Sequence, residues 1–141
     1  MAIASFAPDA AYRPSETEPF MCEQQQTYFR AKLETWKNDI LREAKVTRGL
    51  LANESVGYAD STDRASNETD RALELRTRDR QRKLIAKIDA ALRRLDEGEY
   101  GYCEETGEPI SVRRLDARPI ATMTVEAQER HERRERVHRP D

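Results

Sequence analysis

The sequence predicts an all-α protein made of a long antiparallel coiled-coil hairpin, a small turn-rich globular lobe and a C-terminal helix. Two long, highly charged segments each carry one apolar stripe at helical spacing, and a short polar segment separates them. Hydrophobic residues make up 37% of the 141 residues and aromatic residues only 6%. This is little for a thick globular core but suits the seam of paired helices. The expected domains are an N-terminal lead (1–20), the hairpin (21–97, with its tip at 55–65), the lobe (98–124), and the C-terminal helix with its tail (125–141).

The N-terminal lead should be extended or form one short helical turn, because Pro8, Pro14 and Pro19 interrupt any longer helix. It lacks the basic start of a signal peptide, and no apolar run in the chain approaches the ~20 residues that span a bilayer. Two cysteines 81 positions apart, Cys22 and Cys103, do not make a disulfide framework. We therefore expect a cytoplasmic protein without membrane contact.

The first hairpin helix is expected from about residue 23 to residue 54. Its apolar residues recur at steps of four, three and four, the spacing of one helical face. They are Phe29, Leu33, Trp36 and Ile40, and Ala44, Thr47 and Leu51 can continue the stripe. A helix of this length covers about 48 Å at 1.5 Å per residue.

The second hairpin helix is expected from Asp60 or Ser61 to about Asp96. Its apolar stripe has the same spacing, with Leu84, Ile88, Ala91 and Leu95. Nearer the tip the expected seam is polar, with Thr77 and Arg80 opposite Glu43 and Thr47. The two helices should therefore hold together best where their apolar stripes meet.

The tip joins the two helices and is acidic. Asp60 can cap the second helix, and Asp63, three residues on, resembles the partner of a capping box. Residues 53–70 carry five acidic residues and one arginine, whereas residues 71–94 carry nine basic and three acidic residues. The simplest interpretation is a capped helix with a solvated basic face. The alternative is an acidic point that reaches into a partner.

The lobe begins where Gly98 and Gly101 are suited to end the second helix, and its prolines prevent another long helix. Thr124 can cap a last helix that runs to about Val137, with acidic and basic residues three and four apart.

Four blocks in order resemble the DksA/TraR family of bacterial transcription factors, over about residues 20–135. Besides the Phe29, Leu33 and Trp36 stripe, they are Asp60–Ala65, Leu73–Ile85, Gly98–Glu104 and Ile110–Pro119. The resemblance implies a rod that enters the secondary channel of bacterial RNA polymerase without contacting DNA.

The family's residue roles transfer to matching positions of this chain. The tip motif Asp-x-x-Asp-x-Ala is matched by Asp60, Asp63 and Ala65, which the resemblance places near the polymerase active centre. Arg80 matches the arginine that contacts the rim of the channel.

The resemblance also implies a co-regulator, the stringent-response alarmone guanosine tetraphosphate (ppGpp). Leu84, Lys87 and Arg118 match positions that hold it between factor and polymerase. Cationic side chains are chemically suited to its phosphates. Gln128 replaces a lysine that is frequent in the family, which weakens the match at that position.

The largest departure from the family concerns structural zinc. The four zinc-binding cysteine positions read Cys103, Thr106, Thr124 and Ala127 in this chain. One thiolate does not make a tetrahedral structural site, so we expect no zinc and no other cofactor. The degenerate zinc-finger lobe should then be held by apolar packing, for which the candidates are Tyr102, Ile110, Val112, Leu115 and Ile120.

These observations favour a non-enzymatic, monomeric regulator of transcription initiation at ribosomal RNA and other promoters, with RNA polymerase and guanosine tetraphosphate as partners. Two alternatives remain open: a Gre-like transcript cleavage factor whose tip carboxylates place a metal, and a coiled-coil scaffold. An independent enzyme has no support in the sequence, which contains no phosphate-binding loop or cofactor fingerprint.

Overall fold

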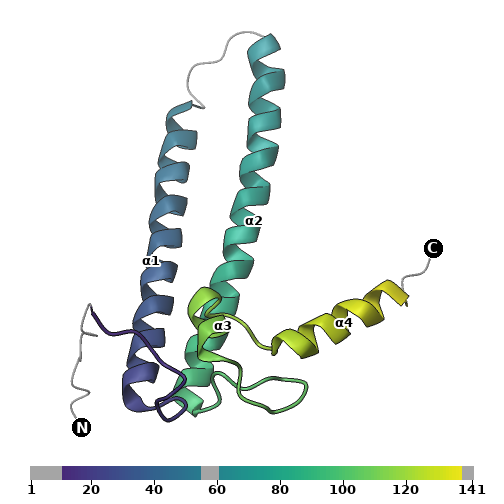
Figure 1. Ribbon diagram of the computed structural model, residues 1–141. Coiled ribbons are helices and arrows are strands. Elements are labelled where there is room, and N and C mark those ends of the chain that lie inside the picture. Colours follow the sequence, from purple (N-terminus) through teal and green to yellow (C-terminus); the bar gives the residue numbers. More distant parts are fainter. Residues whose placement is uncertain (1–10, 55–60, 138–141) are drawn as a thin grey trace. The chain divides into compact units, whose positions relative to one another are not determined.

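The computed structural model describes residues 11–54 and 61–137, and the side chains of residues 11–49 and 67–137. This part of the chain forms four helices: α1 Glu23–Glu54, α2 Ser61–Glu97, α3 Val112–Ala117 and α4 Val125–Val137 (Figure 1). It contains no strand, only an isolated antiparallel bridge between Tyr102 and Pro109. The predicted all-α class is confirmed. None of the described helices has an apolar stretch long enough to cross a membrane.

The chain divides into two compact units. The hairpin unit consists of residues 34–89, and the lobe unit takes in the described residues up to Leu33 and from Ala90 onward. Both long helices contribute to both units, and each unit is considered by itself below.

In the hairpin unit, α1 and α2 run antiparallel side by side (Figure 1). Ile40 and Ile88 are buried and Trp36 is half-buried, as the apolar stripes predict. Lys37 of α1 pairs with Asp89 of α2, with Nζ 2.7 Å from Oδ1. Apolar contact and this ion pair join the two helices at the same level of the hairpin.

The polar part of the seam differs from the sequence prediction. Thr77 and Arg80 are exposed, whereas Glu74, Arg78 and Gln81 are half-buried and face inward. Thr77 still lines the groove between the helices, as expected, but Gln81 takes the inward position expected for Arg80. Polar residues occupy both sets of positions, so no contrast in hydrophobicity revealed the register.

The core of the lobe unit brings α1, α2 and α3 together. Its largest fully buried side chains include Phe29, Leu33, Ile110 and Leu115. Tyr100 is also buried, and its hydroxyl donates a 2.7 Å hydrogen bond to the carbonyl of Pro119. A buried tyrosine needs such an acceptor because an unpaired hydroxyl is costly away from water.

Two of the five expected core residues of the lobe are less buried than predicted. Ile120 is half-buried and Tyr102 is 40% exposed. The Tyr102 ring instead meets Phe20 edge-on, at 5.3 Å between centroids. The expectation that Tyr102 lies in the core was therefore wrong, and Tyr100 takes that place.

Within the lobe unit, the described part of the N-terminal lead packs against the start of α1. Gln25 is fully buried, donates from Nε2 to the carbonyl of Ser15 at 3.0 Å, and accepts at Oε1 from the amide of Met21 at 2.9 Å. The rings of Tyr12 and Tyr28 also meet edge-on at 5.9 Å. The lead is therefore anchored by polar as well as aromatic contacts.

Helix ends follow the predicted signals. Gly98 has φ 76° directly after α2, and the amide of Glu99 donates to the carbonyl of Arg94 at 2.8 Å, as in a Schellman C-cap. Thr124 precedes α4, and its hydroxyl accepts from the amide of Ala127 at 3.2 Å.

Candidate functional site

The acidic tip predicted at 55–65 falls largely outside the described residues. Asp60 lies outside them, and Asp63 and Ala65 belong to the first turns of α2, where only the backbone is described. The start of α2 at Ser61 agrees with the sequence expectation. The capping and partner-contact roles of Asp60 and Asp63 stay predictions.

One face of α2 in the hairpin unit is basic. Arg76, Arg80, Lys83 and Lys87 recur at steps of four, three and four, and all four side chains are exposed. Lys83 pairs with Asp79 one turn away, at 3.2 Å. A row of this kind attracts acidic surfaces, and Arg80 lies in the middle of it.

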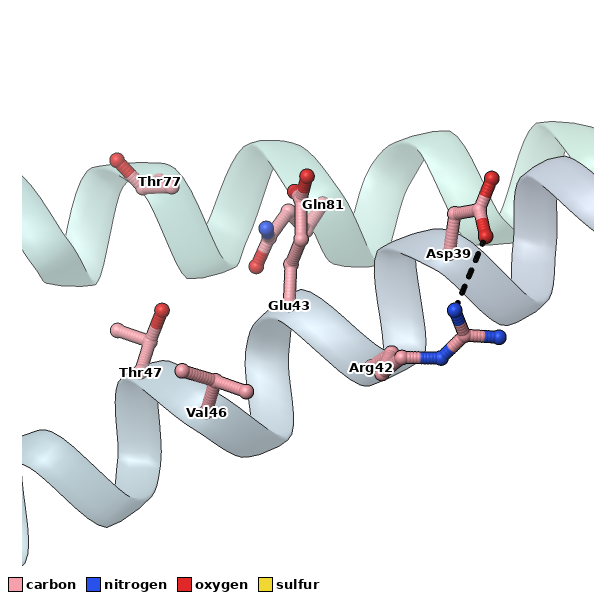
Figure 2. A pocket seen from close by; sticks show the side chains of 7 residues that line it. All are labelled: Asp39, Arg42, Glu43, Val46, Thr47, Thr77 and Gln81. Carbon is pink, nitrogen blue, oxygen red and sulfur yellow. Dashed lines mark ion pairs between the residues drawn. The ribbon is translucent and has the colours of Figure 1, made fainter.

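A groove with a volume of about 540 Å³ lies between the two helices of the hairpin unit. Figure 2 shows Thr47 of α1 and Thr77 of α2 on its two walls, and the ion pair of Arg42 with Asp39 at one end. Its lining residues are Asp39, Arg42, Glu43, Val46, Thr47, Thr77 and Gln81. This composition provides neither a nucleophile with a base nor a metal-ligand set, so the groove is an opening in the seam and not a catalytic site.

The three alarmone candidates can be described one unit at a time. In the hairpin unit, Leu84 is half-buried and Lys87 is exposed. In the lobe unit, Arg118 caps the C-terminal end of α3, where its amide donates to the carbonyl of Arg114 at 2.7 Å, and its side chain is exposed. Lys87 and Arg118 thus each offer an exposed cation.

The lobe gathers hydrogen-bond donors around the thiol of Cys103, which is 3% exposed. Burial alone would raise the pKa of this thiol. Hydrogen bonds from the side chain of Thr106 and from the backbone at Thr124, Thr106 and Glu105 outweigh burial and lower the pKa from 9.0 to about 7. The turn is also closed by backbone bonds from Cys103 to Glu108 and from Gly107 to Cys103, at 2.8 and 2.9 Å.

The other three positions that match zinc-binding cysteines of the family make contacts of their own. Thr106 donates to the Cys103 sulfur, Thr124 caps α4, and Ala127 is fully buried. Sequence segments around 103 and 124 therefore meet in space, as a zinc finger would require, but they meet through hydrogen bonds.

The fold and these features define a class: all-helical proteins in which two long paired helices carry an exposed basic face and join a small lobe closed by two converging turns. The profile of the DnaK suppressor protein DksA, N-terminal domain, matches residues 25–95. The profile of the prokaryotic dksA/traR C4-type zinc finger matches residues 98–133. The chain belongs to the DksA/TraR family.

Similar proteins cover nearly the whole chain. It is 69% identical over 130 residues to the RNA polymerase-binding transcription factor DksA of Caulobacter vibrioides strain NA1000, covering 92% of each chain. Identity to the protein of the same name from Escherichia coli K12 is 39%, over 96% of this chain and 88% of that one. Among solved structures, transcription factor DksA2 from Pseudomonas aeruginosa is 42% identical, with TM-score 0.77 over 94% of this chain and 95% of that chain.

The C4-type finger that the profile describes implies structural zinc, and the residues present do not fit it. A C4 site uses four thiolates, and residues 98–133 contain one cysteine, Cys103. The Thr124 hydroxyl is engaged as a cap, and Ala127 has no donor atom. Across the described residues, no three His, Cys, Asp or Glu side chains gather where a metal ion could be held.

Sequence reasoning missed a polar cluster next to Arg118. Asp116 accepts hydrogen bonds from Tyr28 and Lys32, which lie far away in the sequence on α1. The only sequence signal is that Tyr28 and Lys32 stand four apart on one helical face, and this spacing does not identify the partner.

Proposed function

We propose that this protein binds bacterial RNA polymerase and regulates transcription initiation at ribosomal RNA and other promoters. The observation that carries the proposal is the 69% identity, over 92% of both chains, to a protein named as an RNA polymerase-binding transcription factor. In the hairpin unit the apolar stripes of the two helices are buried against each other, which supports action as a monomer. The protein acts in the cytoplasm, catalyses no reaction itself and does not contact DNA.

Binding takes place through the secondary channel of the polymerase, with the tip inside. By resemblance to the family, Asp60, Asp63 and Ala65 contact mobile parts of the active centre and change the stability of promoter complexes. Promoters whose complexes differ in lifetime then respond differently to one factor.

The exposed basic face supports a contact at the rim of the channel. Arg80 lies in the middle of this face and is free of inward packing. Guanidinium groups pair bidentately with carboxylates, which makes Arg80 suited to an acidic rim.

Guanosine tetraphosphate strengthens the effect through coupled binding, so the factor and the alarmone each raise the affinity of the polymerase for the other. Leu84, Lys87 and Arg118 take part by resemblance, and the exposed cations of Lys87 and Arg118 support this assignment. Gln128 in place of a lysine removes one charge from the set.

Regulation does not depend on structural zinc. The support for this proposal is the donor set at the four positions: one buried thiol, one buried alanine, and two threonines, of which Thr124 caps α4. The lobe core and the anchored N-terminal lead take over the stabilising role that a metal has in a zinc finger.

The test is transcription in vitro with purified bacterial RNA polymerase on a ribosomal RNA promoter, with and without guanosine tetraphosphate. The wild-type protein should lower transcript yield, and the alarmone should deepen the effect. Asp63→Asn should keep polymerase affinity but lose most of the inhibition, because it removes charge at the tip while preserving shape.

Asp70→Asn is the matched control, since Asp70 is an exposed aspartate further along α2. It should behave like the wild type. The proposed mechanism fails if Asp63→Asn inhibits as well as the wild type at equal polymerase binding. Stimulated cleavage of RNA in backtracked complexes would instead favour the Gre-like alternative.

A further inference from the structure

We propose that Asp116 is a positioning residue: held by Lys32 and Tyr28 of α1, it fixes the end of α3 and leaves Arg118 free to bind an anionic phosphate ligand. The inference rests on the proposed function, in which that ligand is guanosine tetraphosphate. It adds three residues for which neither the sequence nor the family resemblance gave a role.

The short helix α3 needs outside support. It has six residues, and helices of this length are unstable alone because nucleation costs more than so few hydrogen bonds return. At its start, Ser111 caps it by accepting from the amide of Arg114 at 3.1 Å. Val112 and Leu115 anchor its inner side in the core. These contacts do not hold the other end, where Arg118 lies.

The far end of α3 is held from α1. The Tyr28 hydroxyl donates to Asp116 Oδ1 at 2.5 Å, and Lys32 Nζ donates to the same oxygen at 2.7 Å and to the Asp116 carbonyl at 2.5 Å. Tyr28 and Lys32 are one turn apart, so they approach from one face of a rigid helix. Lys32 also places a positive charge at the C-terminal end of α3, where the helix dipole favours it.

Arg118 follows Asp116 by two residues, so the contacts that hold Asp116 also restrain the backbone near Arg118. The amide of Arg118 donates to the carbonyl of Arg114, and its own carbonyl accepts from the amide of Ala121 at 3.0 Å. The backbone on both sides of Arg118 is thus fixed while the side chain remains exposed. Fixing a cation before its ligand arrives lowers the ordering cost of binding.

The same contacts also settle which cation Asp116 pairs with. A carboxylate two residues from Arg118 is a natural competitor for the guanidinium. Here the carboxylate of Asp116 pairs with Lys32 instead, and Arg118 makes no ion pair within the described residues. Burial would raise the pKa of Asp116, but the hydrogen bonds from Lys32 and Tyr28 and the charges of Lys32 and Arg13 outweigh it and hold the pKa below its ordinary value. Asp116 is therefore ionised at neutral pH and keeps Lys32 paired.

The test compares Lys32→Met and Asp116→Asn with the wild type in the same transcription assay, titrating guanosine tetraphosphate. Inhibition without alarmone should be unchanged, because neither Lys32 nor Asp116 lies in the hairpin unit. The alarmone concentration for half-maximal effect should rise several-fold. Hydrogen exchange should speed up at the amides of residues 114–118. Lys32→Arg should restore the wild-type alarmone response, since it returns the charge.

The matched control is Asp96→Asn. Asp96 also pairs with a cation on α1 in the lobe unit, Arg30 at 2.6 Å, and among the described residues no hydrogen bond or ion pair joins it to α3. It should leave both the alarmone response and the exchange of 114–118 unchanged. An equal loss of response in Asp96→Asn would overturn the inference, because any lost ion pair would then have the same effect.

Arg118→Ala separates this inference from the proposed function. If Arg118→Ala abolishes the alarmone response and Asp116→Asn leaves it intact, the positioning role is wrong and the alarmone assignment stands. If neither variant changes the response while inhibition without alarmone persists, the alarmone assignment of Arg118 is wrong and the positioning role falls with it.

Discussion

Gly101 is the residue at which backbone conformation and close packing coincide. Its φ is 90°, in a region that residues with a Cβ rarely adopt, and a Cβ would lie 2.9 Å from Phe20 Cζ and 3.2 Å from Met21 Cε. Gly101→Ala should therefore lower the free energy of unfolding by roughly 1–3 kcal/mol. Urea denaturation followed by circular dichroism measures this difference.

Gly49→Ala is the matched control. Gly49 lies within α1 with nothing within 4 Å of an added Cβ, so alanine should stabilise the helix by roughly 0.5–1 kcal/mol. The same change, glycine to alanine, should thus lower the free energy of unfolding at position 101 and raise it at position 49. A neutral or stabilising Gly101→Ala would mean that Phe20 and Met21 do not pack against the turn as described.

At the scale of single residues, the sequence predicted packing better than polar partners. Phe29, Leu33 and Ile40 were expected in the core from their spacing and are buried there. The partners of Asp116 could not be predicted, because a hydrogen bond across 84 or more positions depends on tertiary placement and leaves no local pattern. Tyr102 was expected in the core, where Tyr100 lies, for a similar reason: two tyrosines on either side of Gly101 differ only in the direction that the turn gives their side chains.

At the scale of helices, periodicity predicted the long elements and failed for the short one. The expected bounds of the first and last helices, 23–54 and up to about Val137, agree with α1 and α4. Helix α3 was missed, because six residues between two prolines do not complete a recognisable apolar stripe. Near the groove, where polar residues replace apolar ones on both helices, Thr77 lines the seam as predicted but Gln81 takes the place expected for Arg80.

The groove in the hairpin unit provides a prediction at this scale. Thr47→Val combined with Gln81→Leu replaces polar lining by apolar groups of similar size. Burying the added apolar surface against the opposite helix should raise the free energy of unfolding by about 1 kcal/mol or more, at roughly 25 cal/mol per Å². Hydrogen exchange should slow at the amides of residues 43–47 and 77–81.

Asn38→Leu controls for this substitution, because Asn38 is an exposed amide on α1 outside the groove. It should change neither stability nor exchange near the groove. If the double variant is no more stable than Asn38→Leu, water in the groove stabilises the polar seam as well as apolar packing would.

For the whole molecule, the central question is how a zinc-finger lobe keeps its fold with one cysteine. Unit-wide packing provides an answer: the buried side chains of α1, α2 and α3, the anchored lead around Gln25, and the hydrogen bonds that converge on Cys103. In C4 fingers, metal binding is itself a large part of the folding free energy. On the proposal that this lobe holds no zinc, these contacts of the chain itself supply that stabilisation.

Metal removal tests this account. On the proposal that contacts of the chain alone hold the lobe, dialysis against EDTA should leave the thermal unfolding midpoint and polymerase binding unchanged, and the purified protein should contain far less than one zinc per chain. The matched control restores three cysteines, as Thr106→Cys, Thr124→Cys and Ala127→Cys together. Since the segments around 103 and 124 already converge, this variant should bind zinc and lose stability on chelation. Stoichiometric zinc in the wild-type protein, or its unfolding by EDTA, would show that other ligands complete a metal site and that chain contacts alone do not hold the lobe.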